Sequence, residues 1–100
     1  MISNDLTEIV RQKTATYMEK PYIELQKIVG TKGDCFIVEY RNKRYKFEIE
    51  ANYFEDNKIR VMVSAEPDSI TGWLSGFAMY FAKTVDNVLI LNNDNPNVSF

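Results

Sequence analysis

Apolar and polar residues alternate strictly through the middle of the chain. From residue 44 to residue 53 every second position is apolar, and shorter runs with the same period occur at 36–40 and 59–65. A period of two is typical of antiparallel strands that bury one face and expose the other to water. We therefore predict that these three segments form an antiparallel meander.

The polar stretch between the first two segments predicts a two-residue turn at residues 42–43. This turn would place Tyr40 opposite Tyr45, and Cys35 opposite Glu50. The apolar side chains of both strands would then share one face of the sheet. A shift of the pairing by one residue would instead send them to opposite faces.

The second hairpin is predicted to contain a three-residue loop at residues 55–57, because a two-residue loop would break the shared apolar face. The longer loop pairs Ala51 with Val61. It ends at Asn57, and asparagine tolerates the left-handed backbone that closes such loops.

Helical spacing of apolar residues appears on both sides of the strands. A first helix is predicted to begin near Asp5 and to end before Pro21, because proline disfavours helical geometry in the residue that precedes it. A second helix is predicted over residues 69–84, where its apolar stripe would cover the sheet.

Three shorter segments complete the pattern. Residues 21–29 suit a short helix or a strand, and we favour a strand because alternate apolar residues would share one face. Residues 87–91 are predicted to form a last strand. Residues 92–100 have the composition of a frayed terminus.

These elements predict an α+β fold in a single domain of residues 1–100. It would contain an N-terminal helix, an antiparallel β-meander of three or four strands, a second helix packed on the sheet and a short C-terminal strand. This order of elements is similar to that of small partner-binding scaffolds, including cystatin-like and secretion-chaperone-like folds. The similarity is one of architecture.

Composition removes several classes of chemistry. The chain has no histidine, which removes the commonest general base and metal ligand. Its net charge of −2 does not attract nucleic acid or an anionic membrane, and its longest uncharged apolar stretch is too short to span a bilayer. We expect no catalytic residue, no cofactor and no metal site.

Cys35 is the single cysteine, so no internal disulfide can form. We expect it to be a small buried hydrophobe in a reducing compartment such as the cytoplasm. Glu48 and Glu50 are predicted to lie side by side on the polar face of one strand, where a covered pair could do acid–base work. The same pattern is typical of a solvated face with Lys46 and Arg60 nearby.

Three surfaces are candidates for binding a partner. Small residues on the second predicted helix would form a flat strip, or would let that helix pack closely within the fold. Alternatively, the segment would be partly extended, and its glycines would mark irregular backbone near a bound ligand. Apolar residues would flank the acidic pair on the polar sheet face, and basic residues gather at the tip of the first hairpin. The candidates on the second predicted helix are Gly72, Gly76 and Met79. Those on the polar sheet face are Cys35, Ile37 and Met62, and those at the hairpin tip are Arg41, Lys43 and Arg44.

We therefore expect a small non-enzymatic cytoplasmic protein that binds another macromolecule, as a regulator, inhibitor or assembly factor. Its partner would be another protein or a second copy of this chain. One alternative is a small-ligand binder or histidine-free enzyme, with a pocket between the sheet and the second helix. The residues expected at that pocket are Tyr45, Tyr53, Trp73 and Tyr80. The other alternative is a homodimeric structural protein.

Overall fold

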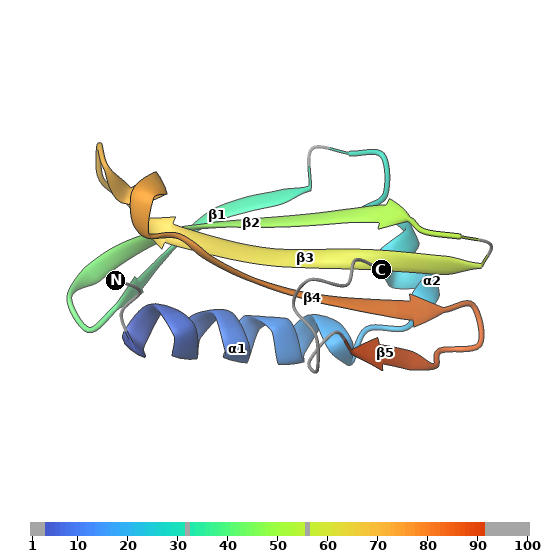
Figure 1. The fold of residues 1–100 in the computed structure, drawn as a ribbon. Coiled ribbons are helices and arrows are strands. Elements are labelled where there is room, and N and C mark those ends of the chain that lie inside the picture. The colour runs from blue at the N-terminus through green and yellow to red at the C-terminus, as the bar shows by residue number, and fades with distance from the viewer. Residues whose placement is uncertain (1–3, 32, 56, 92–100) are drawn as a thin grey trace.

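The computed structural model describes residues 4–31, 33–55 and 57–91 (Figure 1). The described strands form one antiparallel sheet in the order β1-β2-β3-β4-β5, so the α+β class is confirmed. The elements are α1 (Asn4–Met18), α2 (Tyr22–Gln26), β1 (Asp34–Tyr40), β2 (Lys43–Tyr53), β3 (Lys58–Pro67), the 3₁₀ helix η1 (Gly72–Ser75), β4 (Phe77–Thr84) and β5 (Leu89–Leu91).

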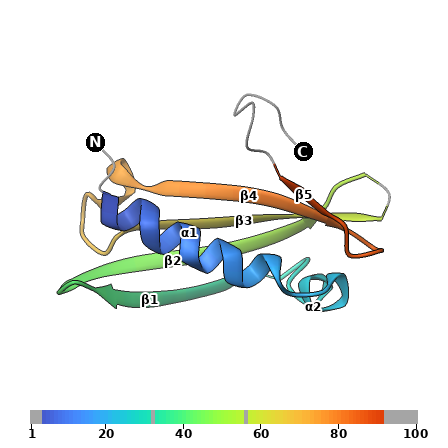
Figure 2. The same ribbon diagram turned by 90° about the horizontal axis from the view of Figure 1, so that it is seen from below.

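The molecule has two layers. Helix α1 runs along one face of the sheet (Figure 2), and the core lies between them. Leu6 and Val10 of α1 are buried there, together with inward side chains of the central strands such as Phe47 and Val61. Each of these strands alternates buried and more exposed residues, because only one face of the sheet is covered by a helix.

No α-helix in the described ranges lies on the opposite face of the sheet, which is uppermost in Figure 1, and the 3₁₀ helix η1 stands at one end of this face. We call this surface the open face. It carries the outward side chains of β1 to β4, among them Cys35, Ile37, Glu39, Arg44, Lys46, Glu48, Glu50, Arg60, Met62, Ser64, Glu66, Ala78 and Tyr80.

The first hairpin differs from the predicted register by two residues. Its turn lies at Arg41 and Asn42, which both have positive φ, of 50° and 65°. This is the pattern of a type I′ turn, whose twist matches that of the flanking strands. Tyr45 therefore pairs with Val38, and the predicted pairing with Tyr40 is wrong. Because the shift is even, the apolar residues still share one face.

The second hairpin confirms its predicted register. Ala51 pairs with Val61, and the backbone N–H of Phe54 donates to the carbonyl oxygen of Lys58 at 3.0 Å. Asn57 has a φ of 63°, the left-handed conformation expected of the residue that closes a three-residue loop. The middle residue of that loop lies outside the described residues.

The helix predicted over residues 69–84 is wrong. The chain forms the short η1 and then β4, in which Phe77, Met79 and Phe81 point to the core at strand spacing. Gly72 is buried, and a Cβ atom added there would lie 1.7 Å from the carbonyl oxygen of Pro67. This glycine therefore permits a close backbone approach where β3 passes into η1.

The favoured strand at residues 21–29 is also wrong, because α2 forms there with Leu25 fully buried. Pro21 stands at the residue before this helix, where its missing N–H is not needed. The predicted last strand is confirmed in part, since β5 pairs with β4 through Ile90 opposite Ala82. The predicted frayed terminus, residues 92–100, lies outside the described residues.

Lys83 is an inward-facing lysine near the end of β4, only 6% exposed. Its Nζ donates hydrogen bonds to the carbonyl oxygens of Met18 at 2.5 Å and Lys20 at 2.7 Å. Carbonyls at the end of a helix have no partner within the helix. Lys83 supplies that partner, and its burial lowers the pKa of the amine.

Candidate docking surface on the open face

The central row of the open face runs across four strands. Cys35 pairs with Glu48, Glu48 with Ser64, and Ser64 with Ala78. In an antiparallel sheet, directly paired residues point to the same side. Two neighbouring members of the row, Ser64 and Ala78, have short side chains, so the surface is low at this position.

Larger side chains border this low position. Met62 and Tyr80 are paired neighbours in the next row, and Tyr80 is 43% exposed. In the opposite direction Ile37 is also 43% exposed, on the edge strand β1. Leu74, from η1, is 65% exposed beside the low position. Four half-exposed or exposed apolar side chains therefore surround the centre of the open face.

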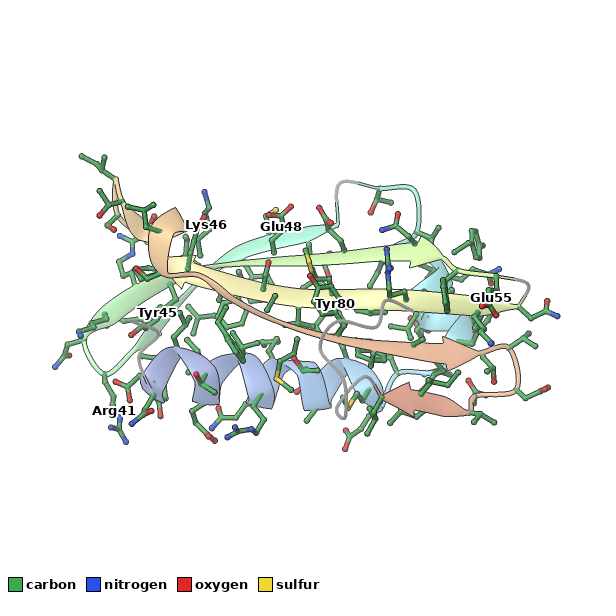
Figure 3. The ribbon with its side chains drawn as sticks, viewed as in Figure 1. Arg41, Tyr45, Lys46, Glu48, Glu55 and Tyr80 are labelled. Atoms are coloured by element: carbon green, nitrogen blue, oxygen red, sulfur yellow. The ribbon has the colours of Figure 1, made fainter. Side chains whose placement is uncertain are left out.

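A hollow of about 380 Å³ lies between this part of the sheet and η1. Its floor contains the small residues Ser64 and Ala78, and the hydroxyl of Ser64 donates to the carbonyl oxygen of Glu48 at 3.3 Å. The residues that line the hollow are Lys46, Glu48, Ser64, Ala65, Glu66, Leu74, Gly76, Phe77 and Ala78. Lys46 and Glu48 extend from the sheet on the side away from α1 (Figure 3).

Two carboxyl groups lie together beside the hollow. A hydrogen bond with the carboxyl group of Glu50 raises the pKa of Glu48, and burial and the negative charge of Glu50 raise it further. The positive charge of Lys46 opposes this shift. The ammonium group of Lys46 is nevertheless paired with Glu66, at 3.8 Å. Within the described structure, no cation lies within 4 Å of either Glu48 or Glu50.

The patch predicted on the polar sheet face is assembled in part as expected. Cys35, Ile37 and Met62 all lie on the open face, and Glu50 pairs with Met62 as predicted. Two details are wrong. Cys35 is exposed, because no described α-helix covers this face, and it pairs with Glu48 instead of Glu50 because of the register shift.

Tyr80 is a member of this patch that the sequence analysis missed. It was assigned to a helix, so its strand face was not considered. A signal was present, because Ala78, Tyr80 and Ala82 alternate with Phe77, Met79 and Phe81.

The glycine strip does not form, because no helix spans its members. Gly72 is buried in η1, and Gly76 has an extended backbone just before β4. Met79 points to the core side of the sheet, opposite Val63, and is partly buried there. The structure therefore separates Gly72, Gly76 and Met79.

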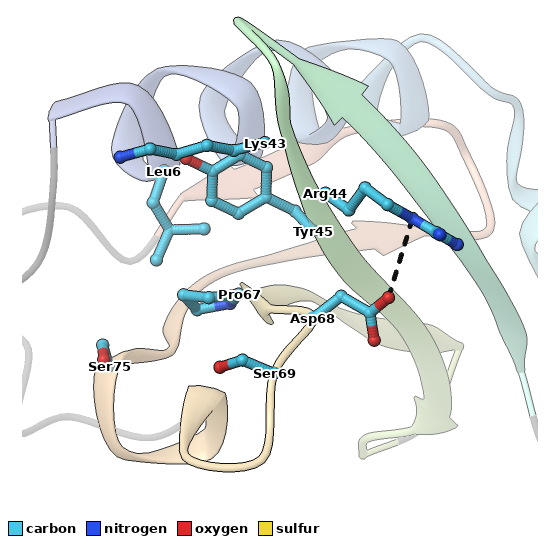
Figure 4. Close-up of a pocket in the computed structure, with 8 residues that line it drawn as sticks. All are labelled: Leu6, Lys43, Arg44, Tyr45, Pro67, Asp68, Ser69 and Ser75. Carbon is cyan, nitrogen blue, oxygen red and sulfur yellow. Dashed lines mark ion pairs between the residues drawn. The ribbon is translucent and has the colours of Figure 1, made fainter.

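The basic residues of the first hairpin are largely engaged within the fold. Arg41 pairs with Asp5 of α1 at 3.3 Å, and Arg44 pairs with Asp68 at 3.7 Å. Lys43 lines a second hollow of about 360 Å³ near the start of α1 (Figure 4). The other residues around that hollow are Leu6, Arg44, Tyr45, Pro67, Asp68, Ser69 and Ser75.

The tyrosines expected around one ligand pocket lie in three different places. Tyr45 lines the hollow of Figure 4, whereas Tyr80 lies on the open face. The hydroxyl of Tyr53 accepts a hydrogen bond from the side-chain amide of Gln26 at 3.1 Å, near α2. The side chain of Trp73 is not among the parts of the chain that the structure describes.

No group of three metal-binding side chains occurs in the described part of the chain. None of its helices is long and apolar enough to cross a membrane.

A scan against protein-family models finds no match to this chain. Searches of curated proteins and of solved structures likewise return no significant match.

Proposed function

We propose that this protein is a non-enzymatic binding module that docks a segment of another protein on its open face. Such a module would act as a regulator, inhibitor or assembly factor. The observation that carries the proposal is the hollow of about 380 Å³ on this face, which is lined by the exposed side chain of Leu74. The exposed apolar side chains of Ile37 and Tyr80 lie on the same face.

Apolar side chains gathered around a hollow have a physical consequence for binding. Covering them removes apolar surface from water, and each Å² covered contributes about 25 cal/mol. Clustered apolar residues with a polar rim commonly mark a protein-binding site. The rim here is supplied by Lys46, Glu48 and Glu66, which can fix the orientation of a partner.

Cys35 offers a probe at the right place, because it is the only cysteine and is exposed on the open face. Its thiol can carry a benzophenone photo-crosslinker without any substitution. A matched control moves the thiol to the exposed surface of α1, in the double variant Cys35→Ser/Thr16→Cys. Both labelled proteins would be irradiated in extract from the cells that naturally produce this protein.

The proposal predicts a defined adduct from the label at Cys35 that is absent from the label at residue 16. The adduct should disappear when Ile37→Asp places a charge on the same face. Identical adducts from both positions, or an adduct that survives Ile37→Asp in a folded protein, would contradict docking on this face. A free thiol at an exposed position also suits the reducing environment of the cytoplasm, where we propose that the protein acts.

Binding of a small ligand is the second candidate function. It is supported by the hollow of Figure 4, where Tyr45 and Pro67 lie near the hydroxyl groups of Ser69 and Ser75. Its volume of about 360 Å³ is at the lower end of the range for small-molecule sites. A fragment screen by NMR would test it, and shifts confined to residues around this hollow are the supporting result.

A further inference from the structure

We propose that the segment docked on the open face is a cationic amphipathic helix. A lysine or arginine of the partner would pair with Glu48 and Glu50. Its apolar residues would contact Ile37, Met62 and Tyr80. This inference rests on the proposed docking function and names the chemistry of the partner.

Unbalanced charge is the first support. Glu48 and Glu50 are neighbours on one face of β2, and like charges at this separation repel each other. The nearest candidate cation on the same strand, Lys46, is paired with Glu66. Elsewhere in the described structure, carboxylates such as Glu55 and Glu24 have a lysine partner within 4 Å. A cation supplied by the partner would neutralise the pair on the open face.

The apolar residues stand on both sides of this acidic pair. Ile37 lies one strand away on β1, Met62 one strand away on β3, and Tyr80 two strands away on β4. Neighbouring strands are separated by roughly 5 Å. One turn of an α-helix rises about 5.4 Å, so a helix lying straight across β2, β3 and β4 advances about one turn per strand. The helix must run diagonally to reach Ile37, which pairs with Lys46, so it advances further between β2 and β1.

The spacing predicts a pattern in the partner sequence. If its basic residue is at position i, over β2, an apolar residue about seven positions earlier lies over Ile37, because Ile37 pairs with Lys46 and is displaced along the strands from Glu48 and Glu50. Apolar residues three or four positions later, and about seven positions later, lie over Met62 and Tyr80. The docked helix would therefore carry one basic residue within an apolar stripe.

Charge also favours a cationic partner over a second copy of the chain as the occupant of the open face. A symmetric dimer would place the same patch of both copies face to face. In a dimer whose two-fold axis passes through the acidic pair, Glu48 and Glu50 would approach the same two carboxylates of the other copy. Charge complementarity favours a different, cationic partner over self-association through this face.

The test uses two designed peptides of 18 residues. One is an amphipathic helix of leucine and lysine, and the other replaces every lysine with glutamate. Each is titrated into the isotope-labelled full chain, and NMR chemical shifts report both the affinity and the location of binding. The test variant is Glu48→Gln/Glu50→Gln. The control, Glu19→Gln/Glu24→Gln, changes the net charge equally, from −2 to 0, but on the α1–α2 side.

We expect the leucine–lysine peptide to shift signals of the open face. Its dissociation constant should rise about tenfold in the test variant and less than about twofold in the control. Binding elsewhere, or binding that is equal in both variants, overturns the inference. Preferential binding of the leucine–glutamate peptide to the open face also overturns it, but leaves the docking function standing. If neither peptide perturbs the open face, both proposals fail.

Discussion

The hydroxyl group of Tyr17 donates a hydrogen bond of 2.8 Å to the carboxylate of Asp34. Tyr17 belongs to α1 and Asp34 is the first residue of β1, so this bond joins the helix to the edge of the sheet. Burial, the hydrogen bond and the negative charge of Asp34 together raise the pKa of Tyr17 from 10.0 to about 12.

This pKa predicts a loss of stability in alkaline solution. Between pH 10 and 12 the unfolded chain loses the Tyr17 proton while the folded chain keeps it, so the free energy of unfolding falls as pH rises. Urea unfolding at pH 8, 10 and 11 measures this slope. The slope should be shallower in Tyr17→Phe than in the control Tyr80→Phe, and equal slopes in the two variants would contradict the assignment.

Lys83→Met tests the buried contact between β4 and the end of α1. The substitution keeps an apolar stem but leaves the carbonyl groups of Met18 and Lys20 without this donor. We expect the free energy of unfolding to fall by about 2 kcal/mol. The exposed lysine Lys27, paired with Glu24 at 3.4 Å, is the control, and Lys27→Met should cost less than about 0.5 kcal/mol. Equal effects from both substitutions would refute a structural role for Lys83.

Two glycine variants distinguish the observed strand from the helix predicted from the sequence. Gly72→Ala places a Cβ atom against the carbonyl oxygen of Pro67, so we expect a loss of about 2 kcal/mol or more. At Gly76 the nearest atom to an added Cβ is 3.4 Å away, and φ is −71°. Gly76→Ala should therefore be neutral, or stabilising by about 0.5 kcal/mol. In a helix both variants would gain stability, so thermal unfolding of the pair decides between the two structures.

Glu48→Gln is expected to stabilise the isolated protein. Because the pKa of Glu48 is raised in the folded state, folding becomes less favourable as pH rises above about 4.5. Solvent still screens this half-buried pair, so the gain at pH 7 should be about 0.5 kcal/mol or less, and it should vanish at pH 3. The control Glu55→Gln loses a lysine partner at 3.0 Å and should not gain stability. A loss of stability in Glu48→Gln at pH 7 would reveal an internal cation partner and weaken the binding proposal.

Alternation was a reliable signal where each strand had one apolar and one polar face. Tyr45, Phe47 and Ile49 alternate with charged residues, and their strand was predicted with the correct buried face. The turn before it lies one residue earlier in the chain than predicted, because Arg41 adopts a positive φ that is uncommon for arginine. The open face could therefore be predicted from the sequence, but its pairs across β1 and β2 could not.

Strand β4 was missed for a physical reason. Apolar residues occur on both of its faces, with Tyr80 outward and Phe81 inward, so the period of two is weak. Lys83 also points inward, where a charged residue is rarely found, and its two carbonyl partners come from α1 and the residues just after it. Contacts between residues far apart in the sequence leave no local sequence pattern. The strand was therefore not predicted, and Tyr80 was not included in the patch predicted on the polar sheet face.

The most direct test of the account is the reactivity of the Cys35 thiol on the open face. Its alkylation rate with a maleimide would be measured by mass spectrometry, in buffer and in concentrated extract from the cells that naturally produce the protein. A thiol moved to residue 16 on α1, in Cys35→Ser/Thr16→Cys, corrects for consumption of the reagent.

Relative to that control, the account predicts that alkylation of Cys35 slows several-fold in extract, and that Ile37→Asp restores the faster rate. Equal relative rates in buffer and extract would mean that nothing covers the open face, and would contradict its role as a docking surface.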